Sequence, residues 1–298
     1  MNLNQLIEIL PMQYIKQNEP MKNHTSFKIG GVADYLVMPQ TITQLKALLT
    51  LINATNTPFF VMGNGSNLLV AESGIRGIVI KTTAIKHLKI DGAKITAGAG
   101  VLLSKLANEA LKKSLSGLEF SHGIPGTFGG GVVMNAGAYG GELKDVIIET
   151  QYLDEHNEIK TLTNHKYSYR HSIFTDNPKW IVLESTALLK LDDPKNIKAK
   201  MDEFALQRKT KQPLELPSAG SVFKRPEGYF AGKLIDDCGL RGFSIGDAQV
   251  SPKHCGFIVN NKNATADDVM NLIKQIQNKV KNKYGIKLTT EIKYVGGR

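Results

Sequence analysis

The sequence predicts an α+β protein of two domains. At 298 residues the chain is long enough to build two hydrophobic cores. Its first two-thirds mix apolar patterns of helical period with β-rich runs. Pro213 and Pro217 then interrupt these patterns, and we expect a domain boundary there.

The first half of the chain is predicted to mix helices and strands throughout. Helices are expected where apolar residues recur every three or four positions, at residues 3–10, 45–52 and 102–111. Strands are expected where β-branched and aromatic residues follow one another, at residues 58–63, 77–82 and 94–100. The first of these, PFFVMG, has the composition of a buried strand.

The second half begins with strands and ends with a long helix. Antiparallel strands are predicted at residues 145–154, 158–163 and 180–192, and a helix at about 196–209. Five apolar residues share one face of a later helix, namely Val269, Leu272, Ile273, Ile276 and Val280. Thr265 and Asp268 resemble its capping box, and residues 287–296 are predicted to close the chain as a strand.

A glycine-rich segment is the strongest indication of function. Between Gly123 and Gly141 the chain has 8 glycines in 19 residues. Glycine lets backbone N–H groups approach a ligand without a Cβ atom between them. Ile124, Val132 and Tyr139 interrupt the glycines, which is not typical of a flexible linker. We therefore predict an ordered loop that binds a phosphate-bearing cofactor.

A second glycine loop, GNGSNLLV at residues 63–70, directly follows a predicted strand. It has Leu68 where a Rossmann fingerprint needs its third glycine, and it lacks the Lys-Ser or Lys-Thr pair of a Walker loop. Alone, it fits a tight turn as well as a ligand loop. Two such loops together can hold the two phosphates of a dinucleotide without a Rossmann fold.

Composition limits the remaining possibilities. The net charge of +10 comes from scattered lysines and arginines, which fits a protein that handles small anions at least as well as a nucleic-acid binder. Cys238 and Cys255 are too far apart for a CxxC site, and the seven histidines form no HExxH pattern, so no metal is expected. We find no signal-peptide pattern or membrane span, and we expect a cytoplasmic protein.

Six segments, in register over nearly the whole chain, resemble a known family. They are NHTSFKIGG, GNGSNLL, GIPGTFGG with NAGAYGGE, YSYRHSIF, PSAGSVFKRP and TTEIKYVG. Together they are similar to the UDP-N-acetylenolpyruvoylglucosamine reductases of bacterial peptidoglycan synthesis. That family reduces an enolpyruvyl ether on UDP-N-acetylglucosamine to a lactyl ether, using NADPH and noncovalently bound FAD, and so makes UDP-N-acetylmuramate.

The resemblance also implies a fold. It is the FAD-binding fold of the vanillyl-alcohol oxidase (PCMH) type, with two α+β subdomains and a smaller α+β substrate domain. Residues 1–212 would form the FAD-binding region, divided near residue 84, and residues 213–286 the substrate-binding domain. Residues 287–298 would return to the first subdomain as a strand.

The resemblance places the cofactor and substrate contacts. Residues implied to contact FAD are Asn64, Gly65, Ser66, Asn67, Gly123, Ile124, Pro125, Gly126, Thr127, Gly130, Asn135 and Gly137. Residues implied to contact the sugar nucleotide are Tyr169, Lys224, Arg225 and His254. Only about 50 residues separate Arg170 from Ser221, which leaves little room for the tyrosine-bearing loop of many relatives and indicates the shorter type of the family.

Three residues are implied to carry the chemistry. Arg170 would stabilise negative charge that develops towards the substrate carboxylate, because a guanidinium can engage a carboxylate bidentately. Ser221 would donate a proton to the adjacent carbon, with help from Lys224 or Arg225. Glu291 would be protonated during catalysis or would bridge through water to Arg170.

Other functions remain open from the sequence. His122 raises the question of a covalent flavin, which would favour an oxidase of hydroxy acids or alcohols. A binding module that has lost catalysis is a second alternative, against which the presence of Arg170, Ser221 and Glu291 argues. A nucleic-acid binder is a third, and it would show strongly salt-dependent binding to random duplex.

Overall fold

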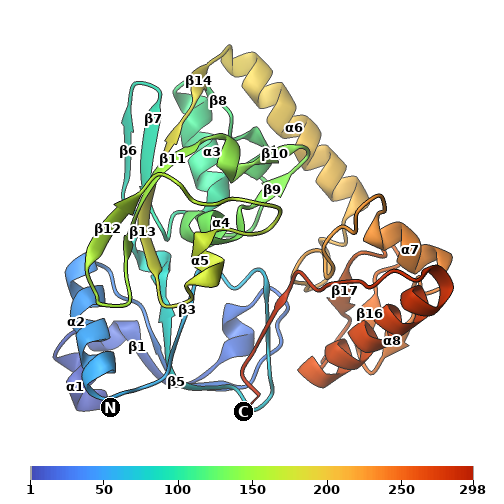
Figure 1. The fold of residues 1–298 in the computed structure, drawn as a ribbon, viewed down its shortest axis with the longest axis horizontal. Coiled ribbons are helices and arrows are strands. Elements are labelled where there is room, and N and C mark those ends of the chain that lie inside the picture. Colours follow the sequence, from blue (N-terminus) through green and yellow to red (C-terminus); the bar gives the residue numbers. More distant parts are fainter. Residues whose placement is uncertain (1, 298) are drawn as a thin grey trace. The chain divides into compact units, whose positions relative to one another are not determined.

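A computed structural model describes residues 2–297 (Figure 1). The chain forms two compact units. The first contains Met1–Lys16, Tyr35–Asn64 and Ile78–Arg208. The second contains Gln17–Asp34, Gly65–Gly77 and Lys209–Arg298. Four elements include residues of both units, namely strands β1 (Ile15–Pro20), β2 (Val32–Val37) and β5 (Ile75–Lys81) and helix α6 (Pro194–Lys211).

The first unit is a mixed α+β structure. Its other α-helices are α1 (Leu3–Ile7), α2 (Ile42–Ala54), α3 (Leu103–Lys112), α4 (Phe128–Met134) and α5 (Ile173–Asp176). Its longer strands are β3 (Phe59–Met62), β6 (Leu88–Asp91), β7 (Lys94–Gly98), β11 (Ile147–Leu153), β12 (Ile159–Leu162) and β13 (Ile181–Leu188). Two-residue strands are β8 (Leu115–Ser116), β9 (Gly137–Ala138), β10 (Gly141–Glu142) and β14 (Lys190–Leu191). Single 3₁₀ turns are η1 (Met12–Tyr14), η3 (Thr82–Ala84), η4 (Glu119–Ser121) and η5 (Leu143–Asp145).

A five-stranded antiparallel sheet organises this unit, in the order β12-β11-β13-β7-β6 (Figure 1). Helix α4 packs on β13, and α3 packs beside α4. One apolar core lies between these elements, and a second core joins α1 and α2 to residues of β5 and β13. Strand β3 pairs in parallel with β5, from Phe59 opposite Ile78 to Met62 opposite Lys81.

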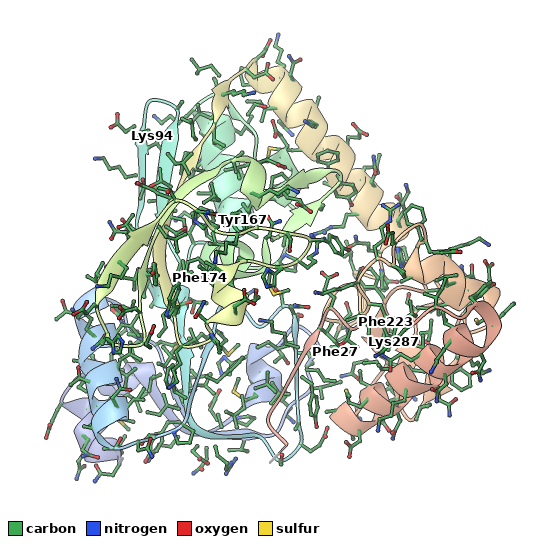
Figure 2. All side chains as sticks on the ribbon, in the orientation of Figure 1. Phe27, Lys94, Tyr167, Phe174, Phe223 and Lys287 are labelled. Carbon is green, nitrogen blue, oxygen red and sulfur yellow. The ribbon has the colours of Figure 1, made fainter. Side chains whose placement is uncertain are left out.

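The second unit is smaller. Its elements are η2 (Met21–His24), β4 (Leu68–Val70), α7 (Ala231–Asp237), β15 (Ser244–Ile245), β16 (Ala248–Val250), β17 (Ile258–Asn260), α8 (Ala266–Tyr284) and β18 (Lys293–Val295). Strands β15, β16 and β17 form an antiparallel sheet on which α8 packs. Strand β18 pairs in parallel with β4. Phe27 and Phe223 belong to an apolar core of this unit (Figure 2).

Most of the predicted elements are confirmed. The five apolar residues predicted to share a face of α8 are all buried, and Thr265 and Asp268 do form its capping box. The three β-rich runs form antiparallel strands, as expected. The prediction of a buried strand at residues 58–63 is wrong in part, because only Met62 of β3 is buried.

Two predictions need larger corrections. The strand expected over residues 287–296 is confined to Lys293–Val295, which pairs with β4. The residues before it do not continue this pairing, and Thr290 forms an isolated bridge to Phe223 instead. The glycine-rich segment is not a loop throughout, since Phe128–Met134 form helix α4. Three consecutive glycines in this helix oppose its formation by intrinsic propensity.

Close packing explains why helix α4 contains glycine. A Cβ atom on Gly129 would lie 2.6 Å from the Cβ and 3.0 Å from the Cα of Ala99. The N–H of Gly129 also donates to the carbonyl of Ala99, at 2.9 Å. A Cβ atom on Gly131 would lie 2.8 Å from Leu143 Cδ1. The missing side chains of Gly129 and Gly131 therefore let α4 pack closely against Ala99 and Leu143.

We predict that Gly129→Ala destabilises the protein, because backbone atoms of Ala99 cannot move away from the new methyl group. The free energy of unfolding should fall by about 1–3 kcal/mol, measured by denaturant unfolding of the protein without FAD. Gly130→Ala is the matched control, since its Cβ atom would meet only Thr127 Oγ1, at 3.3 Å. That variant should be neutral or stabilising, and equal losses in the two variants would contradict this packing.

Candidate cofactor and active site

The start of the first predicted cofactor loop, Gly63 and Asn64, meets the second loop within the first unit. Asn64 Nδ2 donates a hydrogen bond to the carbonyl oxygen of Pro125, at 2.8 Å. A Cβ atom on Gly63 would lie 2.2 Å from Thr127 Oγ1, so the first loop needs glycine where it passes the second. Loops that are some 60 residues apart in the sequence thus form one surface, as a dinucleotide that contacts both would require.

Arg208 is a further candidate cofactor residue, and sequence analysis missed it. Its guanidinium lies against Gly123, where an added Cβ atom would be 3.0 Å from Arg208 Cδ and Nη1. Arg208 Nε is buried and has no hydrogen-bond partner. A buried donor without an acceptor is costly, and a guanidinium suits a phosphate. The residues present therefore fit FAD, with Arg208 beside the predicted diphosphate loop.

Arg170 lies at the tip of a tight turn in the first unit. The turn is closed by backbone hydrogen bonds between Ser168 and His171 in both directions, at 3.1 and 3.2 Å. Arg170 has a φ of +55°, a conformation that costs a residue with a Cβ atom about 1–3 kcal/mol. Its guanidinium lies 5.0 Å from the centre of the Tyr169 ring, and its Nη2 donates to the carbonyl of Gly137 at 2.8 Å.

Asn135 and Glu142 hold this turn in place. Asn135 is fully buried, and its Nδ2 donates both to Ser168 O and to Glu142 Oε2, each at 3.0 Å. Its Oδ1 accepts from the N–H of Lys144, at 3.0 Å. Glu142 Oε1 lies 3.9 Å from Arg170 Nη1. Asn135 was expected to contact FAD; here its side chain connects the glycine-rich segment to the arginine turn.

A neutral histidine, His165, stacks on Tyr167 just before this turn. His165 Nδ1 donates to Thr163 O at 3.1 Å, and its Nε2 lies 2.8 Å from Thr150 Oγ1. Burial lowers the pKa of His165, so that the neutral ring persists near neutral pH. Its ring stacks on Tyr167 with centroids 4.8 Å apart (Figure 2 labels Tyr167). Burial raises the pKa of Tyr167, whose hydroxyl has no hydrogen-bond partner.

The second unit brings Ser221 and Glu291 onto adjacent segments. Ser221 is exposed, whereas the next residue, Val222, is fully buried. The N–H of Glu291 donates to the carbonyl of Val222, at 2.7 Å. The N–H of Val222 donates to the carbonyl of Gly256, at 2.9 Å. Backbone hydrogen bonds on both sides of Val222 therefore fix where Ser221 lies relative to Glu291.

Asn67 of the first glycine loop joins the same network. Its Nδ2 donates to the carbonyl of Glu291 at 3.1 Å, and its own carbonyl accepts from the N–H of Lys293 at 2.9 Å. Surrounding protein atoms, and secondarily the positive charge of Lys224, lower the pKa of Lys293. Two lysines therefore place positive charge next to the Ser221 and Glu291 segments.

The residues predicted to bind the sugar nucleotide are divided between the two units. Tyr169 belongs to the first unit, beside Arg170. Lys224, Arg225 and His254 belong to the second unit. The guanidinium carbon of Arg225 lies 3.9 Å from the centre of the Phe230 ring, and both side chains are exposed. His254 is half-buried, and its ring faces Gly232 and Gly256.

Within residues 2–297, no group of three or more histidine, cysteine, aspartate or glutamate side chains is arranged to hold a metal ion. In the same range, no helix is both long and apolar enough to span a membrane. Both cysteines of the described chain are free thiols.

Two family models match separate parts of the chain. An FAD binding domain matches residues 33–163. The C-terminal domain of UDP-N-acetylenolpyruvoylglucosamine reductase matches residues 212–295. A grass pollen allergen with glucose dehydrogenase activity resembles the fold, with 14% identity and a TM-score of 0.51 over 64% of this chain and 44% of its own. The protein is thus an oxidoreductase with the FAD-binding fold of the vanillyl-alcohol oxidase type, and FAD is its cofactor.

Full-length relatives identify the family. A UDP-N-acetylenolpyruvoylglucosamine reductase from Caldanaerobacter subterraneus subsp. tengcongensis is 53% identical over 99% of this chain and 98% of its own. The crystal structure of that reductase (MurB) from Thermus caldophilus superposes with a TM-score of 0.80 and 35% identity, over 93% of this chain and 97% of the other. The chain belongs to the UDP-N-acetylenolpyruvoylglucosamine reductase family.

We predict that Asn135→Gly destabilises the protein, because glycine accepts the φ of +46° at this position but removes three side-chain hydrogen bonds. The free energy of unfolding should fall by about 1–3 kcal/mol, since three partly buried hydrogen bonds are lost together. Asn56 also has a φ of +46°, but its side chain is exposed. Asn56→Gly is therefore the control and should change stability by less than about 0.5 kcal/mol; equal losses would refute the role of the Asn135 amide.

Proposed function

We propose that this protein uses NADPH to reduce the enolpyruvyl ether of UDP-N-acetylglucosamine enolpyruvate to the lactyl ether of UDP-N-acetylmuramate. Membership of the reductase family supports the substrate class. The observation that carries the assignment of residues is the 2.7 Å hydrogen bond from the N–H of Glu291 to Val222 O. This bond joins the segment that carries Ser221, the candidate proton donor, to the segment that carries Glu291.

The chain supplies the binding surface and the electrostatics, and the cofactor supplies the redox chemistry. When bound, noncovalent FAD would supply the hydride chemistry that connects NADPH with the methylene carbon of the enolpyruvyl group. We propose that the joined loops around Asn64 and Gly123–Gly130 hold its diphosphate, with Arg208 as the charged partner. The orphaned Nε of Arg208 supports this role.

Arg170 is proposed to stabilise the negative charge that develops on the substrate carboxylate. A guanidinium acts best when it is already oriented before the charge appears. The strained backbone at φ +55°, the bond to Gly137 O and the ring of Tyr169 all restrict where this side chain can lie. The cost of this strain is consistent with a functional position.

Ser221 is proposed to donate a proton to the carbon next to the reduced methylene. A serine hydroxyl is a weak acid, so positive charge must stabilise the alkoxide that it leaves. Lys224 and Lys293 belong to the same unit as Ser221, and we propose that they supply that charge. The backbone bonds of Val222 hold Ser221 in one position, as proton transfer over hydrogen-bond distance requires.

Glu291 is proposed to act as a neutral acid during catalysis. An ionised carboxylate would repel the anion that develops on the substrate, whereas a protonated one can donate a hydrogen bond to it. Its main chain is held by Val222 and Asn67, which fixes the position from which its side chain extends.

We assign sugar-nucleotide binding to residues 213–286 and flavin binding to residues 1–212, with the C-terminal residues 287–298 contributing a strand to the flavin-binding part. The match of residues 212–295 to the C-terminal domain of the family supports this division. We further infer that the reaction takes place in the cytoplasm, where NADPH is available, and involves no nucleic acid.

We predict that Ser221→Ala separates the two half-reactions. Under anaerobic conditions NADPH should bleach the flavin of this variant at the normal rate, because the serine has no part in that step. Recovery of colour and formation of product on adding the enolpyruvyl sugar nucleotide should slow by about 10²–10⁴-fold, the usual contribution of general acid catalysis. Ser218→Ala, in the same loop, is the control and should keep both half-reactions.

Equal damage to both half-reactions would remove the role of Ser221. The wild-type protein tests the wider proposal: a flavin that NADPH does not bleach, or that the substrate does not reoxidise, would contradict it. Flavin that stays attached to His122 after acid precipitation, together with rapid reoxidation by oxygen, would favour the oxidase alternative.

We predict that Glu291→Gln retains at least about ten times more activity than Glu291→Ala, because the amide preserves a neutral hydrogen-bonding group. The measurement is the rate of product formation at saturating substrate. Melting temperatures of both variants provide the control, since neither substitution changes the main-chain bonds of residue 291. An inactive glutamine variant beside an active alanine variant would exclude a neutral acid.

A further inference from the structure

We infer that His254 is a positioning residue for Ser221, acting through Gly256, and is not a contact for the sugar nucleotide. The N–H of Gly256 donates to His254 Nδ1, at 3.0 Å. The carbonyl of the same glycine accepts the N–H of Val222, at 2.9 Å. His254 therefore fixes Gly256, whose carbonyl bonds to the residue after Ser221. This inference depends on the proposed function, in which Ser221 donates a proton.

A compact turn surrounds this contact. The N–H of Phe257 donates to the carbonyl of His254 at 2.9 Å, and Ser221 forms a β-bridge with Phe257. The buried hydroxyl of Ser251 accepts from the N–H of His254, at 3.3 Å. The turn from Ser251 to Phe257 is thus the backbone neighbour of Ser221. Within this turn, the ring of His254 accepts a main-chain hydrogen bond.

Packing fixes the orientation of the imidazole. A Cβ atom on Gly256 would lie 2.9 Å from His254 Cε1, and one on Gly232 would lie 3.4 Å from it. The ring also makes an edge contact with Phe257, at 5.0 Å between centroids and an interplanar angle of 71°. The absence of a Cβ atom at both glycines leaves room for the ring edge at Cε1, and Nδ1 is directed at the N–H of Gly256.

The protonation state matches this role. An acceptor at Nδ1 requires the neutral ring with its proton on Nε2. Burial, with a smaller effect of the Arg241 charge, lowers the pKa of His254. The ring is therefore neutral at pH 7 and can serve as a permanent acceptor.

The test compares substitutions that keep or remove an acceptor at this position. In His254→Asn the side-chain oxygen can occupy the place of Nδ1, whereas in His254→Gln the oxygen lies one methylene further out. We expect His254→Ala and His254→Gln to slow reoxidation of the reduced flavin by substrate roughly ten- to a hundredfold, because small displacements of a catalytic group are costly. His254→Asn should stay within about threefold of the wild type, and flavin reduction by NADPH should be normal in all three.

A double-variant cycle distinguishes this inference from the proposed function. If His254 acts through Ser221, then adding His254→Ala to Ser221→Ala should slow the reaction no further. Multiplied effects of the two substitutions would overturn the inference. Full activity of Ser221→Ala alone would instead overturn the proposed function.

Substrate affinity separates positioning from contact. We expect the KM for the sugar nucleotide to be unchanged within about twofold in His254→Ala, with the loss in kcat. A raised KM with normal kcat would show direct substrate contact and refute the inference. An equal loss of activity in His254→Asn and His254→Gln would also refute it, since only asparagine can place an acceptor oxygen where Nδ1 lies. His156→Ala, at an exposed histidine, controls for the general effect of removing an imidazole.

Discussion

The peptide groups of Val222 are the constraint on which the catalytic part of the second unit depends. Val222 is fully buried, so neither its N–H nor its carbonyl can bond to water. Gly256 O and the N–H of Glu291 satisfy them. Each such bond contributes about 0.5–1.5 kcal/mol, but leaving a buried group unpaired costs about 1–3 kcal/mol. The segments of Ser221 and Glu291 are therefore tied together by the penalty of separating them.

The first unit uses side chains for the same purpose. The buried amide of Asn135 has partners from the arginine turn, from Glu142 and from the backbone of Lys144. This set of bonds supports Arg170 in a conformation that its own backbone disfavours. Both units thus place functional groups next to buried, hydrogen-bonded neighbours, which is how a rigid site is built from flexible side chains.

Local patterns in the sequence predicted the elements whose stability is local. Helix α8 has one apolar face and a capping box, and both can be recognised without knowing its neighbours. Helix α4 could not be predicted, because its glycines favour a helix only through contact with Ala99 and Leu143. The end of the chain from residue 287 to 292 has the composition of a strand, yet its partners are isolated bonds to residues near 222.

The candidate site also combines features that the sequence predicts with features that depend on distant contacts. Arg170, Ser221 and Glu291 were identified through motifs of a family, and the hydrogen bonds that orient them were not. Arg208 carries no local signal, since a lone arginine near the end of a polar helix is ordinary until Gly123 is found against it. The link from His254 through Gly256 to Val222 joins two separate stretches of main chain, which no local pattern reveals.

Amide hydrogen exchange of Val222 and Glu291 tests the central claim most directly. If buried backbone bonds fix the Ser221 segment to Glu291, both amides should exchange as slowly as those of the β16–β17 ladder in the same unit. Exchange as fast as that of the exposed residues around Gly228 would show that these bonds do not hold the site, and would contradict the account.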